Sequence, residues 1–130
     1  MSQPAAKQND QIIATDMHDV TVTGSVTPQS LLHPFNGRLD SGLSGNVFVN
    51  GLAAATVGSN ASNQPPHIPT APGVAFVLPP SNRGRVTTGS GTVFINGLAA
   101  ARSGDTAQTC ADPAPNNSGQ VVAAGNVYIG

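Results

Sequence analysis

The stretch GSGTVFINGLAAARSGDTAQTC, at residues 89–110, decides the fold because most of it occurs twice in the chain. The segment GNVFVNGLAAATVGS, at residues 45–59, repeats its apolar alternation, its Asn-Gly pair and its run of alanines. The final GNVYIG, at residues 125–130, is the strand half of a third copy, and QPAAKQND, at residues 3–10, is the alanine half. A chain that opens and closes within a repeat predicts a ring of three similar units whose termini are adjacent.

Each strand half alternates between two faces, with Val47 and Val49 on one face and Phe48 on the other. The Asn-Gly pair after it predicts a tight turn, because both residues tolerate positive φ. The alanines predict close backbone packing at a narrowing axis. An apolar period of 3.6 residues never persists for three turns, so we expect almost no helix. The expected fold is all-β: a small, cone-shaped, pseudo-threefold β-helical or β-prism arrangement with Pro/Gly-rich loops.

Three further segments lie between the repeats. Residues 19–27 predict a short half-buried strand, with Val20 and Val22 on one face. Residues 28–43, which contain His33, are predicted to be irregular. Residues 60–89 and 106–118 are predicted to be polar loops, with a brief strand at 75–78, because proline and glycine interrupt them.

The composition excludes several classes of protein. Charged residues make up only 8% of the chain and the net charge is −1, so nucleic-acid binding has no electrostatic basis. Residues 1–16 have neither a basic start nor an apolar core, and no apolar run approaches the ~20 residues of a membrane span. We therefore expect synthesis in the cytoplasm without a signal peptide.

The apolar content is small. Val, Ile, Leu and Phe together number 29 of 130 residues, which is close to the lower limit for a self-sufficient core. One cysteine excludes an internal disulfide. A hydrophobic core this small benefits from an additional cross-link, such as a bound metal ion.

The candidate metal ligands are the three histidines and the single cysteine: His18, His33, His67 and Cys110. Their separations match no zinc-finger spacing. The repeat places them in register, however, since His18 and His67 each lie eight residues after the end of an alanine element and Cys110 lies five residues after one. Each unit therefore sends one ligand toward the axis, and His33 can supply the fourth, which completes the tetrahedral shell of a structural zinc site.

The alternative interpretation is that these histidines are solvated and that Cys110 is a small buried apolar residue. The register with the repeat favours the metal site. A structural zinc ion contributes on the order of 10–16 kcal/mol in small peptides, enough to order loops rich in proline and glycine.

An enzyme is disfavoured by the same residues. Catalytic zinc keeps an open position for water, whereas four protein ligands close it. The carboxylates available as bases, at Asp16, Asp19, Asp40 and Asp112, are of a type that usually forms turns and caps. Ser81, Ser90 and Ser103 have no His–Asp pair independent of the repeat, so a catalytic triad with a serine nucleophile is not expected. A zinc hydrolase is therefore the third of three hypotheses.

The alanine elements LAAARSGD and PAAKQND resemble the motif of the PAAR-repeat family, and the strands VFVNG, VFING and VYIG and the set of three histidines and one cysteine are similar to it too. The resemblance covers nearly the whole chain. It implies a sharp cone of β-structure with structural zinc, rather than iron, near the apex. It also implies a flat base that sits on the trimeric β-helical spike of a type VI secretion system, a phage tail or a related contractile injection particle.

Carried over by position, the resemblance gives the metal ligands as His18, His33, His67 and Cys110. It gives the spike-binding surface as Val47, Phe48, Val49, Val93, Phe94, Ile95, Val127, Tyr128 and Ile129. The second alanine element has Thr56 and Ser59 where the third has Arg102 and Asp105, so this side is expected to lack an ion pair. Residues 1–130 are expected to form a single PAAR-type domain without an effector extension.

The leading hypothesis is a non-enzymatic tip that caps a trimeric spike protein, VgrG-like or of a phage tail, with one tip per trimer. It would sharpen the spike, pierce an envelope without spanning it, and travel on the particle to the outside or into a target cell. The alternative is an adaptor whose loop at residues 60–88 recruits a toxin, another effector or a surface ligand.

Overall fold

The structure, a computed structural model, describes residues 2–130, and this part of the chain consists of strands and turns without an α-helix. The prediction of an all-β chain is confirmed. The longer strands are β2 (Gln11–Val22), β3 (Gln29–Ser41), β6 (Asn60–Asn63), β7 (Gly73–Phe76), β8 (Arg83–Val86), β11 (Thr106–Thr109) and β12 (Asn116–Val122). The two-residue strands are β1 (Gln3–Pro4), β4 (Phe48–Val49), β5 (Leu52–Ala53), β9 (Phe94–Ile95), β10 (Leu98–Ala99) and β13 (Tyr128–Ile129).

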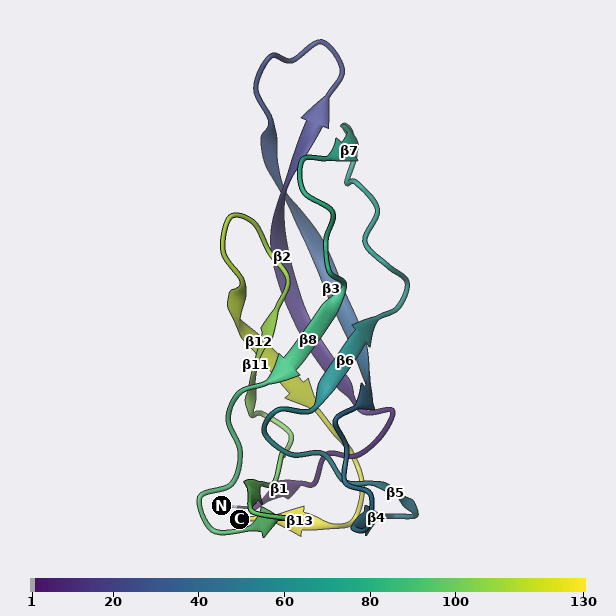
Figure 1. The fold of residues 1–130 in the computed structure, drawn as a ribbon, viewed down its shortest axis with the longest axis vertical. Coiled ribbons are helices and arrows are strands. Elements are labelled where there is room, and N and C mark those ends of the chain that lie inside the picture. Colours follow the sequence, from purple (N-terminus) through teal and green to yellow (C-terminus); the bar gives the residue numbers. More distant parts are fainter. Residues whose placement is uncertain (1) are drawn as a thin grey trace.

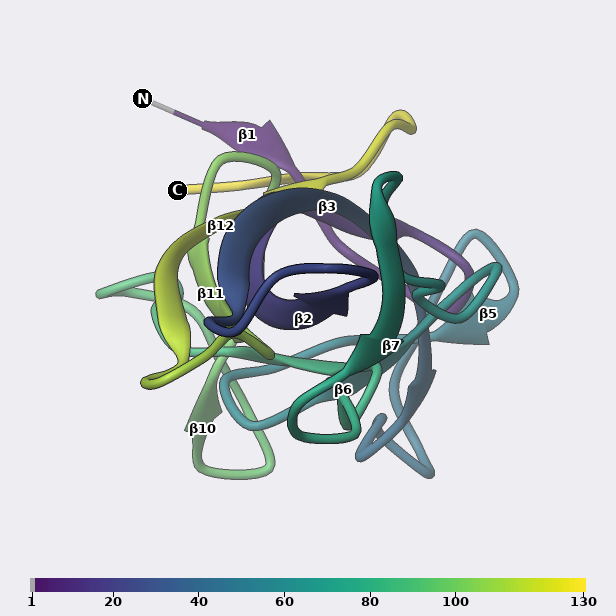
Figure 2. The ribbon, with the colours of Figure 1, turned by 90° about the horizontal axis from the view of Figure 1, so that it is seen from above.

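Six strands close into an antiparallel β-barrel. The order is β12-β11-β8-β6-β3-β2, and a further pairing of β2 with β12 closes the ring (Figures 1 and 2). Closure leaves no open edge among these six strands where they pair. The barrel contains three strand pairs, β2–β3, β6–β8 and β11–β12, and each pair follows one alanine element. The three units of the repeat therefore contribute one pair each.

Backbone hydrogen bonds join the three alanine elements into a ring at the end of the barrel that is nearer to the termini. Ala6 donates its N–H to Ala101 O (2.9 Å), Ala101 donates to Ala55 O (3.0 Å), and Ala55 donates to Ala6 O (3.0 Å). All three are at most 1% exposed, and a larger side chain would hold the three backbones apart. The termini meet at this end, where Gln3 pairs with Ile129 (Figure 1). This is the ring of three units that the repeats predict.

Two apolar clusters stabilise the molecule, one inside the barrel and one at the end that holds the two termini. In the barrel, Phe35 is the largest fully buried side chain, and Gly37 leaves room for it: a Cβ at Gly37 would lie 2.7 Å from the Phe35 ring. The other residues of this barrel cluster are Ala6, Ile12, Leu39, Ala55, Ala61, Val86, Ala101, Ala107, Val121 and Ala123. We call the end that holds the two termini the base. The cluster at the base contains two residues from each unit: Ala5, Ala54, Ala100, Val49, Ile95 and Ile129.

The prediction that residues 28–43 are irregular is wrong, because most of this segment is β3. Its buried side alternates regularly through His33, Phe35, Gly37 and Leu39, but a histidine and a glycine conceal this period in the sequence. Pro34 is tolerated because it pairs with β2 only, and the pairing of β3 with β6 begins at Gly37. Likewise, the predicted loops 60–89 and 106–118 contain β6, β8 and β11 and the start of β12.

The β2–β3 hairpin projects beyond the barrel at the end opposite the termini (Figure 1). β7 extends one side of it by pairing with residues Val20 to Val22 of β2. Val26, in the turn of the hairpin, is fully exposed. The described part of the chain holds no helix that is long and apolar enough to cross a membrane.

Candidate metal centre and base surface

Four side chains converge at the end of the barrel from which the β2–β3 hairpin projects. Asp16, His18, His67 and Cys110 each offer one ligand atom, and these atoms all lie within 4.8 Å of one another. Asp16 and His18 are two residues apart on β2 and therefore share its inner face. His67 comes from the loop after β6, and Cys110 follows β11. This buried group could bind a metal ion.

Three of the separations between ligand atoms in the group are close to those of a tetrahedral shell. Cys110 Sγ lies 3.7 Å from His18 Nε2 and 3.6 Å from Asp16 Oδ2. His67 Nε2 lies 3.3 Å from Asp16 Oδ2. Zinc–ligand distances of about 2.0–2.1 Å to N or O and 2.3 Å to S put tetrahedral ligands about 3.3 Å apart, or about 3.6 Å apart where one is sulfur. These three separations are compatible with a bound metal ion.

Outer contacts hold three of these side chains in place. His18 Nδ1 lies 3.2 Å from Asp112 Oδ2, so that Nε2 points to the centre. His67 Nδ1 lies 3.2 Å from the Asn63 side-chain amide. Asp16 Oδ1 accepts hydrogen bonds from Thr109 Oγ1 and Asn116 Nδ2, which leaves Oδ2 facing the group. Such second contacts fix the direction of metal ligands in proteins.

His33 lies beside the group rather than within it. Its ring centroid is 5.3 Å from that of His18 and 5.6 Å from that of His67, and it is 1% exposed. Nδ1 lies 2.9 Å from Leu31 O, and Nε2 accepts the Thr70 backbone N–H at 3.0 Å. The structure thus brings three of the four sequence-predicted ligands together with Asp16. The role of His33 stays a prediction.

Burial and hydrogen bonding act in opposite directions on the pKa values of the ionisable side chains here. Burial alone would raise the pKa of Asp16, but hydrogen bonds from His67, Thr109 and Asn116 hold it below the usual 3.8. Burial opposes protonation of His67, yet its hydrogen bonds to Asp16 and Cys110 raise its pKa from 6.5 to about 9. Burial lowers the pKa of His33, and the backbone bond to Leu31 only partly opposes this. The two engaged groups, Asp16 and His67, therefore form an ion pair when no metal is bound.

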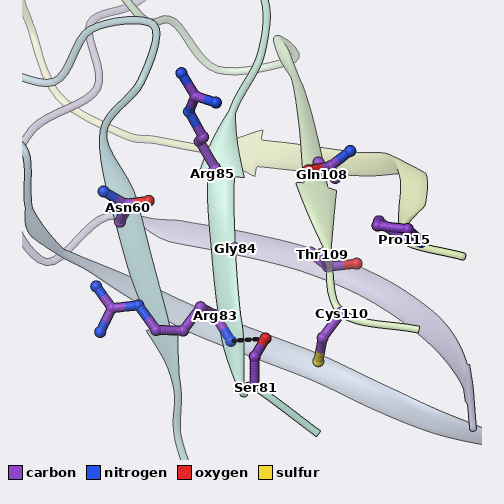
Figure 3. Close-up of a pocket in the computed structure, with 9 residues that line it drawn as sticks. All are labelled: Asn60, Ser81, Arg83, Gly84, Arg85, Gln108, Thr109, Cys110 and Pro115. Carbon is purple, nitrogen blue, oxygen red and sulfur yellow. Dashed lines mark hydrogen bonds between the residues drawn. The ribbon is translucent and has the colours of Figure 1, made fainter. Parts of the chain in front are cut away.

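Cys110 is reached from the surface by two open grooves. The first, of about 210 Å³, is lined by Cys110 together with side chains of β8 and β11, including Arg83, Arg85 and Gln108 (Figure 3). The second, of about 400 Å³, runs past His18 and Asp112 to the same thiol. A metal ion therefore has a path to a site whose other ligands are buried.

Sequence reasoning treated Asp16 only as a possible base or turn residue. The signal that could have found it is the pair Asp16-x-His18, since alternate residues of a strand share one face. That signal required residues 11–18 to be recognised as strand, whereas the predicted strand began at residue 19.

The base surface repeats three times with nearly equal exposure. Phe48, Phe94 and Tyr128 are 59%, 59% and 61% exposed, and Val47, Val93 and Val127 are 36%, 37% and 39% exposed. The remaining three residues of the predicted spike-binding set, Val49, Ile95 and Ile129, are 7–8% exposed and pack into the base cluster. The free apolar surface is therefore made by the first six.

Comparison with known families identifies the third unit of the ring. A family model described as the PAAR motif matches residues 78–130, which hold β8 to β13, the third alanine element and Cys110. Residues 78–130 belong to the PAAR motif family. The predicted resemblance is confirmed over these residues, which include the alanine element LAAARSGD. The PAAR motif indicates a structural spike-tip protein of type VI secretion and related contractile systems. No curated protein and no solved structure matches the chain.

Proposed function

We propose that this protein is a non-enzymatic tip that binds the end of a trimeric β-helical spike, VgrG-like or of a phage tail, and sharpens it for piercing an envelope. The supporting observation is the threefold base, where Phe48, Phe94 and Tyr128 have nearly equal exposure on the three equivalent short strands β4, β9 and β13. A trimer presents three identical sites around an axis, so a single chain with three similar units can meet each subunit once.

The cone that the PAAR resemblance implies is proposed on the layout of the strands. Six two-residue strands and their turns surround the base, whereas the opposite end narrows to the β2–β3 hairpin with β7 beside it (Figure 1). We place the base against the spike and the hairpin forward. The protein would then travel on the injection particle and reach the outside or the target cell with it.

In this proposal the metal centre stabilises the half of the molecule that carries the β2–β3 hairpin. Zinc, in preference to iron, would be held by His18, His67 and Cys110 and a fourth ligand, and it would supply cross-links between segments that share few apolar contacts. His18 belongs to the first unit, His67 to the second and Cys110 to the third. One ion would therefore tie the three units together above the barrel core.

The same shell supports a structural rather than catalytic role. Four protein ligands occupy every position of a tetrahedral ion and leave none for water or substrate. The outer contacts of His18 and Asp16 use their remaining polar atoms. The groups needed to activate a nucleophile are thereby committed to holding the site.

Stoichiometry tests the proposal. The purified protein is mixed with a purified trimeric spike, and the mass of the complex is measured by light scattering after gel filtration. We expect one copy per trimer. A spike truncated at its terminal β-helical turns serves as the control and should not bind. Three copies per trimer, or no complex with the intact spike, would contradict the proposal.

The adaptor remains the second candidate, because the loop around β7 exposes apolar side chains. Ile68 is 77%, Val74 62% and Leu78 56% exposed. An apolar-lined groove of about 600 Å³ runs along the loop past Pro65 and Pro66. If the loop recruits a toxin, Ile68→Asp should abolish that binding while metal content and spike binding stay unchanged. Unchanged binding of the toxin to this variant would count against the adaptor.

A further inference from the structure

We infer that one side of the barrel binds an acidic segment of a protein partner. This surface, which we call the arginine wall, consists of the exposed side chains of Arg38 on β3 and of Arg83 and Arg85 on β8. It includes neither the base nor the metal ligands, so the inference goes beyond the proposed function. It rests on the positions of the three arginines, on their lack of acidic partners, and on a difference in charge between the three units.

The pairing of the strands brings the three arginines onto one outer face of the barrel. Arg38 is opposite Ser62 of β6, and Ser62 is opposite Arg83, so Arg38 and Arg83 lie in one row across three strands. Neighbouring strands are about 4.8 Å apart, which puts the two Cα atoms about 10 Å from each other. Arg85 lies two residues after Arg83 on β8 and shares its face. Figure 3 shows the Arg83 side chain extending sideways toward the strand that carries Asn60.

The other two cations of the chain are already paired with carboxylates. Lys7 pairs with Asp10 at 3.0 Å, and Arg102 pairs with Asp105 at 2.9 Å. Within residues 2–130 the remaining ion pairs are between histidine and aspartate. The arginine wall therefore carries all the lysine and arginine charge that no carboxylate of the described chain neutralises.

The contacts of the wall arginines are with neutral oxygens. Arg38 donates to Asn9 O at 3.2 Å, and Arg83 donates to Ser41 Oγ at 3.2 Å. Arg85 forms no side-chain hydrogen bond with the described residues, and the groove of about 210 Å³ beside it has no carboxylate in its lining (Figure 3). Exposed guanidinium groups in such surroundings can bind carboxylates with two parallel hydrogen bonds.

The arginine wall occurs only once around the ring. Equivalent backbone bonds define the correspondence between units: Asn9 donates to Leu39 O, Gly58 to Val86 O and Gly104 to Val121 O. The residue before each acceptor is Arg38 in the first unit, Arg85 in the second and Gln120 in the third. The third unit thus lacks the charge, so the wall can bind one partner per molecule although the fold repeats three times.

An acidic protein segment fits this surface better than a nucleic acid or an anionic membrane does. Three cations neutralise about three phosphates, which is too few for strong binding to a nucleic acid. Asp40 is exposed on the same face of β3 as Arg38 and would oppose the phosphates of a membrane. A protein segment can place carboxylates opposite the arginines and a neutral or basic side chain opposite Asp40.

The test uses the full-length protein and a short fluorescent peptide in which glutamate and threonine alternate. A peptide of glutamine and threonine is the neutral control. Binding is measured by fluorescence anisotropy, and chemical shifts of the backbone amides locate the contact. We expect the acidic peptide to bind, with an affinity that falls as salt is added, and the neutral peptide not to bind. The shift changes should be confined to β3, β6, β8 and β11.

Arg85→Gln copies the third unit and should weaken binding of the acidic peptide about threefold or more, as expected for one exposed charge pair. Gln120→Glu is the matched control, because it makes the same change in net charge on another side of the barrel, and it should alter the affinity less than about twofold. Asp40→Asn removes the carboxylate beside Arg38 and should strengthen binding. All three variants should keep the wild-type unfolding midpoint and bind the spike as the wild type does, so failure of this inference is distinguishable from failure of the proposed function.

Equal weakening by Arg85→Gln and Gln120→Glu would show attraction by net charge alone and would overturn the inference. Binding of both peptides, or of neither, would also overturn it. Vesicles that contain phosphatidylglycerol and a single-stranded oligonucleotide are tested in the same way. Tighter binding of either one than of the acidic peptide would assign the wall to a membrane or to a nucleic acid instead.

Discussion

Ala6 donates its backbone N–H to the carbonyl oxygen of Ala101 at 2.9 Å, which joins the first alanine element to the third although the two lie near opposite ends of the chain. Ala55 completes the ring by accepting from Ala101 and donating to Ala6. The three alanines of the ring belong to the barrel cluster, and the residues directly before them, Ala5, Ala54 and Ala100, belong to the base cluster. The three units can therefore form only together, and we expect a single cooperative unfolding transition.

The turn after each alanine element is closed by one side-chain acceptor. Asp105 Oδ2 accepts the Arg102 backbone N–H at 2.7 Å, and Ser59 Oγ accepts the equivalent N–H of Thr56 at 3.0 Å. Asp105→Ala removes this acceptor, so we expect a loss of about 1–3 kcal/mol in the free energy of unfolding, measured by urea titration. The second unit supplies the matched control, since Asp105→Ser copies its chemistry and should cost less than half as much. Equal losses for the two variants would show that the turn does not depend on this bond.

The expected absence of an ion pair in the second unit follows from the same turn. Lys7 and Asp10 form one at 3.0 Å, and Arg102 and Asp105 form one at 2.9 Å. In the second unit Ser59 Oγ donates to Gly42 O instead. The three turns therefore share their backbone geometry and differ in charge.

The base gives a prediction about symmetry. Phe94→Asp should weaken binding to the spike by more than about tenfold, since exposed aromatic residues are the usual anchors of an interface. Phe48→Asp and Tyr128→Asp should have effects within a few-fold of it, because the three side chains are equally exposed. Surface plasmon resonance on the immobilised trimer measures all three.

Val26→Asp is the control for the base variants, because Val26 is fully exposed in the hairpin at the opposite end. It should bind the spike as the wild type does. Sensitivity at only one of the three base positions would show that the protein meets the trimer asymmetrically. Loss of binding in Val26→Asp would place the contact at the wrong end.

The repeats allowed the ring, the adjacent termini and the convergence of His18, His67 and Cys110 to be predicted from the sequence. Similar sequences adopt similar backbones, so register alone placed these residues near the axis. The barrel could not be predicted in this way, because its strands are irregular in composition: β3 buries His33 and Gly37 alongside Phe35 and Leu39. Asp16 was missed for the same reason, since its inward direction depends on a strand whose start the sequence does not mark.

Removal of the metal should be costly. Cys110→Ala should abolish stoichiometric zinc and lower the midpoint of thermal unfolding by about 10 °C or more, because a structural zinc ion is worth many kcal/mol. His67→Ala should behave alike. Ser81→Ala is the matched control: Ser81 lines the same groove as Cys110 but lies outside the ligand group (Figure 3). A chelator should lower the midpoint of the wild type and leave that of Cys110→Ala unchanged. Full stability of the chelated wild type would contradict a structural role for the ion.

The metal-free and metal-loaded proteins should respond to pH in opposite directions. In the metal-free protein the pKa of His67 is raised from 6.5 to about 9, so its ion pair with Asp16 stabilises the fold fully below pH 6.5 and is lost as the pH rises through 9. The pKa of Asp16 is lowered from 3.8, so the contribution of Asp16 is present above 3.8 and is lost as the pH falls through its folded value. The unfolding midpoint without metal should therefore decline between pH 6.5 and 9.

Metal binding requires neutral histidine and thiolate, so zinc affinity should rise over the same interval. The difference in unfolding midpoint between zinc-loaded and chelated protein should accordingly widen from pH 6.5 to 9. His67→Gln, chelated, is the control and should show a flatter profile over this range because the titrating ring is gone. If the chelated wild type instead becomes more stable with rising pH, then the Asp16–His67 pair does not stabilise the metal-free fold, and zinc would be replacing a repulsive arrangement rather than an ion pair.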